Sequence, residues 1–226
     1  MMAPAAVLFD LDGTLLDTAA DITLALNRTV REFGWAPVSE TAARSMIGRG
    51  GLALIERAAL SQQRELDPAL GERMVERFYQ HYGRVEDAGE AVTQPYAGAA
   101  DALQRLCTAG VRTAVVTNKQ HRFSEQMLQR LGLRPWLDLV IGGDSCPRRK
   151  PDPLPLLYAC ERLGIEPRHA LMVGDSINDV LAARGAKINV ICVTYGYNEG
   201  QDPRTLPCDG WIDSLAELPA WLLAAV

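Results

Sequence analysis

The chain has 226 residues, of which 48% are hydrophobic and 23% charged, a composition typical of a globular protein with an ample core. The formal net charge is −5, so composition offers no basic surface for nucleic acid or an anionic membrane. No apolar run approaches a membrane span, and residues 1–4 do not resemble a signal peptide. The five cysteines are odd in number and form no CxxC pair, which indicates reduced thiols and a cytoplasmic protein.

The first element is a short apolar run, Val7-Leu8-Phe9, which predicts a buried strand. Two carboxylates, Asp10 and Asp12, stand where this strand ends and the chain turns at Gly13. Both can therefore converge on one small volume, where two negative charges require a cation or a proton between them. Mg²⁺ prefers carboxylate and phosphate oxygens, so this segment is a candidate metal site.

Residues 17–90 show helical periodicity and no convincing strand. Three apolar stripes predict helices within residues 22–33, 52–59 and 74–82. We expect a helical subdomain here, with Asp17 capping its first helix and the chain returning through residues 83–89 and 92–95. The predicted boundaries are therefore a core of residues 1–16 and 91–226 and an inserted subdomain of residues 17–90.

Strands and helices alternate in the rest of the chain. Apolar runs predict strands at residues 111–116, 137–141, 170–173 and 188–193, with helical patterns between them. This alternation predicts an α/β fold with a parallel sheet covered by helices on both faces. Ligands of such sheets bind beyond the carboxyl ends of the strands, which is where Asp10 lies. Residues 211–226 predict a short strand and a terminal helix.

Polar side chains stand beyond the second predicted strand and in a later loop. Thr117 and Asn118 follow the strand at residues 111–116 and offer donors to a phosphate oxygen. Lys150 stands beside two prolines, which indicates a rigid loop. We interpret its neighbours Arg148 and Arg149 as a surface basic cluster.

A further acidic group follows the strand predicted at residues 170–173. Asp175 stands directly at the strand end and Asp179 lies four residues later. Ser176 is the predicted N-cap of the next helix. Acidic residues at a helix start often serve only the helix dipole, but Asp175 precedes the cap and is a stronger candidate for chemistry.

The order of these motifs resembles that of the haloacid dehalogenase superfamily of phosphohydrolases. Four segments carry the resemblance, in the order of the superfamily's motifs: Asp10-Leu11-Asp12-Gly13-Thr14, Thr117, Lys150-Pro151-Asp152, and Gly174-Asp175-Ser176 with Asp179. The helical insertion resembles the superfamily's C1-type cap. The resemblance implies a Rossmann-like parallel sheet with an inserted α-helical cap.

It also implies Mg²⁺-dependent hydrolysis of a small phosphate monoester through an aspartyl-phosphate. The implied catalytic residues are Asp10 as nucleophile, Asp12 as general acid and base, and Thr117 and Lys150 as partners of the phosphoryl oxygens. The implied metal site consists of Asp10, Asp12 through its backbone carbonyl, Asp175 and Asp179. Asn118 would add a substrate-binding donor. An acid at position 12 argues against dehalogenation.

The predicted substrate-binding segment of the insertion is Gly48-Arg49-Gly50. Its glycines let backbone N–H groups approach an anion, and Arg49 suits a carboxylate; the alternative is a plain turn between helices. With residues 193–200 and the overall size, this segment resembles bacterial phosphoglycolate phosphatases. That implies conversion of 2-phosphoglycolate and water to glycolate and phosphate.

Other activities stay open at this point. The alternatives are a sugar-phosphate phosphatase, such as one acting on N-acetylmuramate 6-phosphate, and a mutase related to β-phosphoglucomutase. A non-enzymatic scaffold is disfavoured because all six motif side chains are present. We expect a monomer or homodimer that binds neither nucleic acid nor membrane.

Overall fold

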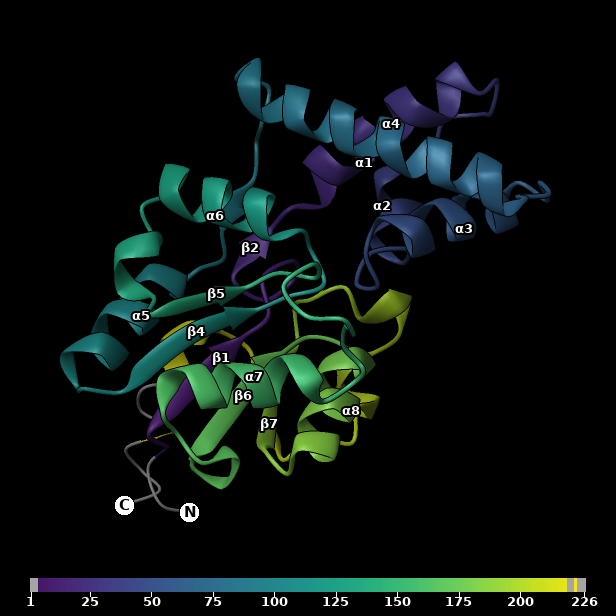
Figure 1. The fold of residues 1–226 in the computed structure, drawn as a ribbon. Helices are drawn as coiled ribbons and strands as arrows, with labels where there is room; N and C mark the ends of the chain where they lie inside the picture. The colour runs from purple at the N-terminus through teal and green to yellow at the C-terminus, as the bar shows by residue number, and fades with distance from the viewer. Residues whose placement is uncertain (1–3, 219–221, 223–226) are drawn as a thin grey trace.

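The computed structural model describes residues 4–218 and 222, and its centre is a parallel sheet (Figure 1). Within the described residues this sheet has six strands, in the order β5 (Leu139–Ile141), β4 (Arg112–Val116), β1 (Ala6–Phe9), β6 (Ala170–Gly174), β7 (Asn189–Val193) and β8 (Gly210–Ile212). Every neighbouring pair runs parallel. The predicted α/β class with a parallel sheet is therefore confirmed.

The first strand lies in the middle of this sheet, and all four of its residues are buried. Its last residue, Phe9, is in register with Val115 of β4 on one side and Val173 of β6 on the other. Parallel strands in register end at one edge of the sheet. The residues that follow β1, β4 and β6 are therefore neighbours in space, as the strand-end argument predicts.

Helices cover both faces of the sheet. Val7 and Phe9 of β1 belong to one apolar cluster, whereas Ala6 and Leu8 belong to the other, because successive side chains of a strand point to opposite faces. The first cluster includes residues of α5 (Ala99–Thr108) and α6 (His121–Arg130), and the second those of α7 (Leu154–Leu163) and α8 (Ile177–Ala186). The predicted strand at residues 137–141 starts two residues late, after a 3₁₀ turn at Arg134–Trp136.

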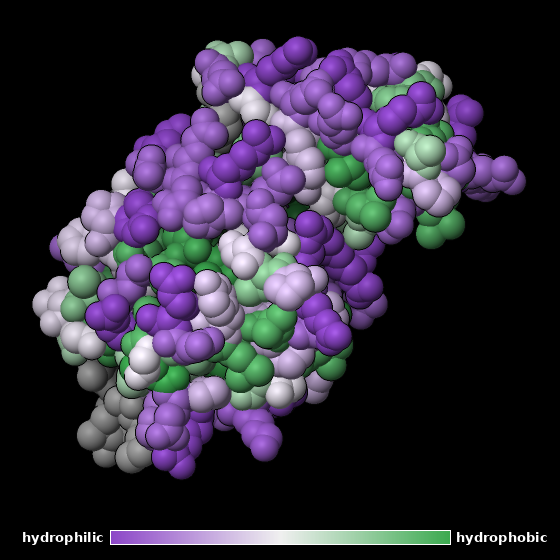
Figure 2. All heavy atoms as spheres, in the orientation of Figure 1, coloured by the Kyte–Doolittle hydropathy of each residue, from purple (hydrophilic) through white to green (hydrophobic). Residues whose placement is uncertain are grey.

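The insertion is helical, as predicted. Within the described residues it contains four helices, α1 (Ala19–Glu32), α2 (Glu40–Arg44), α3 (Gly51–Ser61) and α4 (Pro68–Asp87), grouped beside the sheet in Figure 1. The sequence missed α2, because five residues are too few to show an apolar stripe. Figure 2 shows hydrophilic residues over most of the insertion's outer face.

The predicted return crossing at residues 83–89 is wrong, because α4 continues to Asp87. Val85 is fully buried on this helix, so its last turn belongs to the packed structure. The segment that returns from the insertion to the core is held further along the chain. There the carboxylate of Asp21 accepts hydrogen bonds from the N–H groups of Val92 at 2.9 Å and Thr93 at 3.0 Å.

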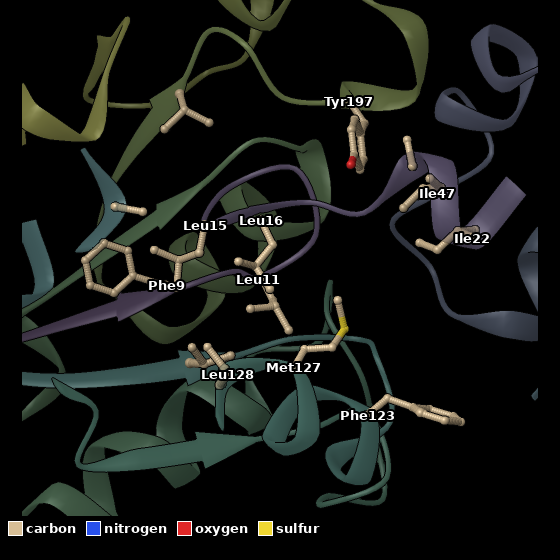
Figure 3. Packing of buried hydrophobic residues seen from close by; sticks show 14 of the residues in the cluster. Phe9, Leu11, Leu15, Leu16, Ile22, Ile47, Phe123, Met127, Leu128 and Tyr197 are labelled. Atoms are coloured by element: carbon tan, nitrogen blue, oxygen red, sulfur yellow. The ribbon is translucent and has the colours of Figure 1, made fainter. Parts of the chain in front are cut away.

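The two crossings between the sheet and the insertion pair with each other. Leu16–Asp17 (β2) and Gln94–Pro95 (β3) form an antiparallel ladder of two residues each. The apolar cluster continues from the sheet through Leu11, Leu15 and Leu16 to Ile22 and Ile47 of the insertion (Figure 3). The insertion is therefore joined to the core by contiguous packing as well as by two chain crossings.

The strand predicted in the tail is β8. The terminal helix predicted after it falls largely on residues 219–221 and 223–226, which lie outside the described residues. None of the helices in the described part of the chain combines the length and the hydropathy needed to cross a membrane.

Candidate active site

Asp10 is the first residue after β1, and its carboxylate is oriented by two donors. Its Oδ1 accepts the N–H of Leu11 at 2.7 Å and lies 2.9 Å from Nζ of Lys150. Nζ of Lys150 also donates to Oδ1 of Asp179 at 2.6 Å. Asp10, Lys150 and Asp179 are all buried, so one ammonium group is shared by two carboxylates away from solvent.

Asp179 is held by the start of α8. Its Oδ2 accepts the N–H of Asp175 at 3.2 Å and the N–H and hydroxyl of Ser176 at 3.1 and 2.9 Å. Ser176 is the N-cap residue, as predicted. Both oxygens of Asp179 are therefore engaged by the protein, which makes this residue a rigid support for its neighbours.

Asp175 faces Asp10 across the ends of β6 and β1. Its Oδ1 accepts the hydroxyl of Thr14 at 3.1 Å and its Oδ2 accepts the N–H of Tyr197 at 2.7 Å. The chain passes close to this carboxylate at Gly196, where an added Cβ would lie 2.1 Å from the Cβ of Asp175. Only glycine leaves the space that this side chain occupies.

These carboxylates suit a divalent cation. Ligand oxygens of Asp10, Asp175 and Asp179 lie within 4.8 Å of one another, and all three residues are buried. Burial raises the pKa of Asp10 to about 6, although Lys150 opposes this shift. Burial, together with the charges of Asp179 and Asp10, raises the pKa of Asp175 well above its usual range. Three buried carboxylates beside one lysine leave an excess negative charge, and hard oxygen donors of this kind fit Mg²⁺.

Burial alone would lower the pKa of Lys150. The attraction of Asp10 and Asp179 outweighs burial, so the pKa of this lysine lies above its usual range. Lys150 is therefore a permanent positive charge beside Asp10 at any physiological pH.

The motif after β4 contributes two buried polar residues. The hydroxyl oxygen of Thr117 accepts the N–H of Lys119 at 3.3 Å. Asn118 donates from Nδ2 to the backbone oxygens of Gly48 and Lys150, each at 2.9 Å. The side chain of Asn118 thus holds the glycine turn of the insertion against the core.

A pocket lies between the core and the insertion. The core lines it with Asp10, Asp12, Thr117, Asn118 and Lys119. The insertion lines it with Gly48, Gly50 and an aromatic wall of Phe78, Tyr79 and Tyr82. The structure therefore brings Asp10, Asp12, Thr117 and Asn118 together with the two predicted glycines. Lys150, Asp175 and Asp179 stand around Asp10 outside this lining.

Arg49 is placed differently from its neighbouring glycines. Its Nε donates to Oε1 of Glu199 at 2.7 Å, its side chain is 47% exposed, and it does not line the pocket. Glu199 also pairs with Arg57 at 2.6 Å. Arg49 thus joins the insertion to the loop after β7. Arg148 and Arg149 are exposed, in agreement with the predicted surface cluster.

The prediction that Asp17 caps the first helix of the insertion is wrong. The N-cap residue of α1 is Thr18, and the N–H of Ala19 lies 3.5 Å from Asp17. Asp17 instead accepts hydrogen bonds from Arg44 at 2.9 Å and from the hydroxyl of Tyr197 at 2.8 Å. A charged partner and a phenol hold this carboxylate more strongly than one backbone N–H.

Sequence reasoning missed Lys119. Its Nζ lies 3.0 Å from Oδ1 and 3.2 Å from Oδ2 of Asp12, and 4.5 Å from the centre of the Tyr82 ring. The available signal was its position directly after Thr117 and Asn118 at a strand end. The aromatic partner could not be found, because Tyr82 reads only as part of a helical stripe.

The model of the family described as haloacid dehalogenase-like hydrolase matches residues 7–193. The chain therefore belongs to this family of enzymes, and the resemblance seen in its motifs is confirmed. It is 43% identical over 213 residues to a protein of Nitrosospira multiformis named phosphoglycolate phosphatase, covering 94% of this chain and 92% of the relative. It is 39% identical to one of Thiobacillus denitrificans with the same name and coverage.

A solved structure supports the same family relationship. The structure described as a predicted phosphoglycolate phosphatase from Haemophilus somnus superimposes with a TM-score of 0.89 at 30% identity, covering 98% of this chain and 99% of the other. The chain is thus an enzyme similar over nearly its whole length to phosphoglycolate phosphatases, which are phosphoric monoester hydrolases.

Proposed function

We propose that this enzyme hydrolyses a phosphate monoester by forming an aspartyl-phosphate on Asp10. The observation that carries the proposal is the placement of Asp10 in the pocket, oriented by Lys150 and beside Asp12. In this proposal residues 17–90 act as a cap over a catalytic core of residues 1–16 and 91–226. A cytoplasmic location and a monomeric or dimeric state remain part of the proposal.

In the first step an oxygen of the Asp10 carboxylate forms a bond to phosphorus while the bond from phosphorus to the ester oxygen breaks. Asp12 gives its proton to the leaving oxygen, which matters most for alkoxides because they are poor leaving groups. Thr117 and Lys150 face the charge that develops on the phosphoryl oxygens.

In the second step a water attacks the phosphorus of the aspartyl-phosphate. Asp12, now a carboxylate, takes the water's proton, and the bond between phosphorus and Asp10 breaks. Inorganic phosphate leaves, and both carboxyl groups return to their starting state. Asp10, Asp175 and the backbone carbonyl of Asp12 would hold Mg²⁺, with Asp179 orienting that site. When bound, the ion would supply positive charge for the phosphoryl group.

We propose 2-phosphoglycolate as the substrate, which gives glycolate and phosphate. Support comes from the names of the relatives and from the small glycine-lined and aromatic pocket. The test is phosphate release from a panel containing 2-phosphoglycolate, N-acetylmuramate 6-phosphate and several hexose phosphates, with Mg²⁺ and with EDTA.

We expect the highest kcat/KM for 2-phosphoglycolate, no turnover in EDTA, and no turnover by Asp10→Asn. A hexose phosphate ranking first would overturn the proposed substrate but not the chemistry. Isomerisation of a sugar phosphate without net phosphate release would overturn the hydrolase. Activity retained by Asp10→Asn would overturn the nucleophile.

A further inference from the structure

Lys119 occupies a position that the proposed chemical steps do not use. It lies in the turn between β4 and α6, and its side chain is only 7% exposed. Its ammonium group contacts both oxygens of Asp12 and lies over the ring of Tyr82 in α4. Tyr82 in turn packs edge-on against Phe123, at 5.1 Å between ring centres. The ammonium is therefore held in place by the core on one side and the insertion on the other.

Lys119 also supplies the positive charge of the pocket. Among the described residues that line the pocket, it is the only lysine or arginine. Three other cations of the described chain lie near the site. Lys150 bridges Asp10 and Asp179, and Arg49 pairs with Glu199. Arg149 lies beside Gly50 and donates from Nε to the backbone oxygen of Gly143. The insertion's share of the lining consists of apolar and aromatic side chains and glycines. An anion buried in this pocket without a partner would be strongly disfavoured.

The distances restrict which part of a substrate can reach Lys119. In the proposed reaction Asp12 contacts the leaving oxygen, and Lys119 lies one hydrogen bond beyond Asp12, at 3.0 Å. Two successive hydrogen bonds place Nζ of Lys119 within about 6 Å of the leaving oxygen, and a third joins Nζ to the group that it binds. That group must therefore lie within about 9 Å of the leaving oxygen. A carboxylate one methylene away satisfies this limit.

We propose that Lys119 binds a carboxylate of the substrate and thereby selects short phosphooxy-carboxylic acids over phosphate esters of neutral alcohols. This inference rests on the proposed function and assigns its substrate specificity to a residue. The ammonium carries three donors, so it can contact the substrate carboxylate while it remains beside Asp12. Lys119 thus takes the carboxylate-binding role that the sequence predicted for Arg49, whose side chain pairs with Glu199 instead.

The test compares two substrates that differ mainly in the group proposed to meet Lys119. 2-Phosphoglycolate carries the carboxylate, and 2-hydroxyethyl phosphate carries a hydroxymethyl group in its place. The variant is Lys119→Met, which keeps the unbranched stem against Tyr82 and removes the charge. Arg168→Met is the matched control, because Arg168 is 70% exposed and precedes β6, at the opposite end of the sheet from the site.

We expect Lys119→Met to lower kcat/KM for 2-phosphoglycolate about 10- to 100-fold more than for 2-hydroxyethyl phosphate, the range expected for a hydrogen bond between charged groups. In the Asp10→Asn background, where binding is measured without turnover, calorimetry should show a similar selective loss of affinity for 2-phosphoglycolate. Lys119→Arg should recover part of the preference for 2-phosphoglycolate over 2-hydroxyethyl phosphate. Arg168→Met should change neither the ratio of kcat/KM for the two substrates nor the ratio of their affinities.

Equal losses for both substrates in Lys119→Met would overturn the proposal, because they would mean that Lys119 only positions Asp12. An unchanged affinity for 2-phosphoglycolate in the Asp10→Asn background would overturn it as well. Failure of the proposed function would look different, since the wild-type enzyme would then release phosphate from neither compound. Thermal midpoints of the variants show whether each is folded.

Discussion

The buried carboxylates predict that the metal-free enzyme loses stability as the pH rises. Burial raises the pKa of Asp10 from 3.8 to about 6. The folded state therefore binds more protons than the unfolded chain between these two values. A folded state that binds more protons loses stability as the pH rises through that window. Asp175, whose pKa is also raised by burial, adds to the effect with the same sign.

The magnitude follows from the shift of Asp10 alone. Each pKa unit corresponds to about 1.4 kcal/mol, so the whole shift amounts to about 3 kcal/mol. Roughly half of it, about 1 to 2 kcal/mol, falls between pH 5 and 7.5. For a chain of this size, that difference corresponds to a decrease of roughly 3–6 °C in the thermal midpoint.

Other carboxylates do not interfere in this window. Despite partial burial, Asp17 and Glu199 have pKa values below their ordinary range because arginines pair with them. Their contributions are lost only as the pH falls below about 5. The window from pH 5 to 7.5 therefore reports on the buried cluster.

The assay is thermal unfolding followed by circular dichroism at several pH values, with EDTA and with Mg²⁺. In EDTA the midpoint should fall from pH 5 to 7.5, and Asp10→Asn should reduce that slope. Mg²⁺ should stabilise more at pH 7.5 than at pH 5, because its ligands must be deprotonated. Equal midpoints at both pH values in EDTA, or the same slope in Asp10→Asn, would refute the reasoning.

Three substitutions test the remaining geometry. Asp12→Asn should lower kcat more for 2-phosphoglycolate than for para-nitrophenyl phosphate, because a nitrophenolate leaves without a proton; equal losses would contradict Asp12 as the acid. Gly196→Ala should weaken Mg²⁺ binding measured by calorimetry, because the new Cβ overlaps Asp175; unchanged affinity would show that the loop moves freely. Lys150→Met should destabilise the enzyme in urea by about 3–5 kcal/mol, because it leaves Asp10 buried without its partner; a change below about 1 kcal/mol would contradict that pairing.

Much of the fold could be predicted because its signals are local. An apolar run such as Val7-Leu8-Phe9 is buried on both faces, so it reads as a strand without any knowledge of its partners. Asp10 and Asp175 follow such runs, and a parallel sheet brings strand ends to one edge. Their proximity therefore follows from the pattern together with the topology.

Other features depend on partners that sequence spacing does not reveal. Arg49 suits a carboxylate by its chemistry, but its orientation is decided by Glu199, which lies 150 residues away. Asp17 precedes a helix, yet Arg44 and Tyr197 determine its contacts. Each of these contacts joins distant segments, so only the folded structure shows which partner is bound.

The loop after β7 is attached at both ends to different parts of the molecule. Tyr197 donates its N–H to Asp175, while two residues later Glu199 pairs with Arg49 and Arg57 of the insertion. These ion pairs are partly exposed, so dissolved salt screens them. A movement of the insertion away from the core would break these pairs, so we expect ligand exchange between the pocket and solution to become faster as the ionic strength rises.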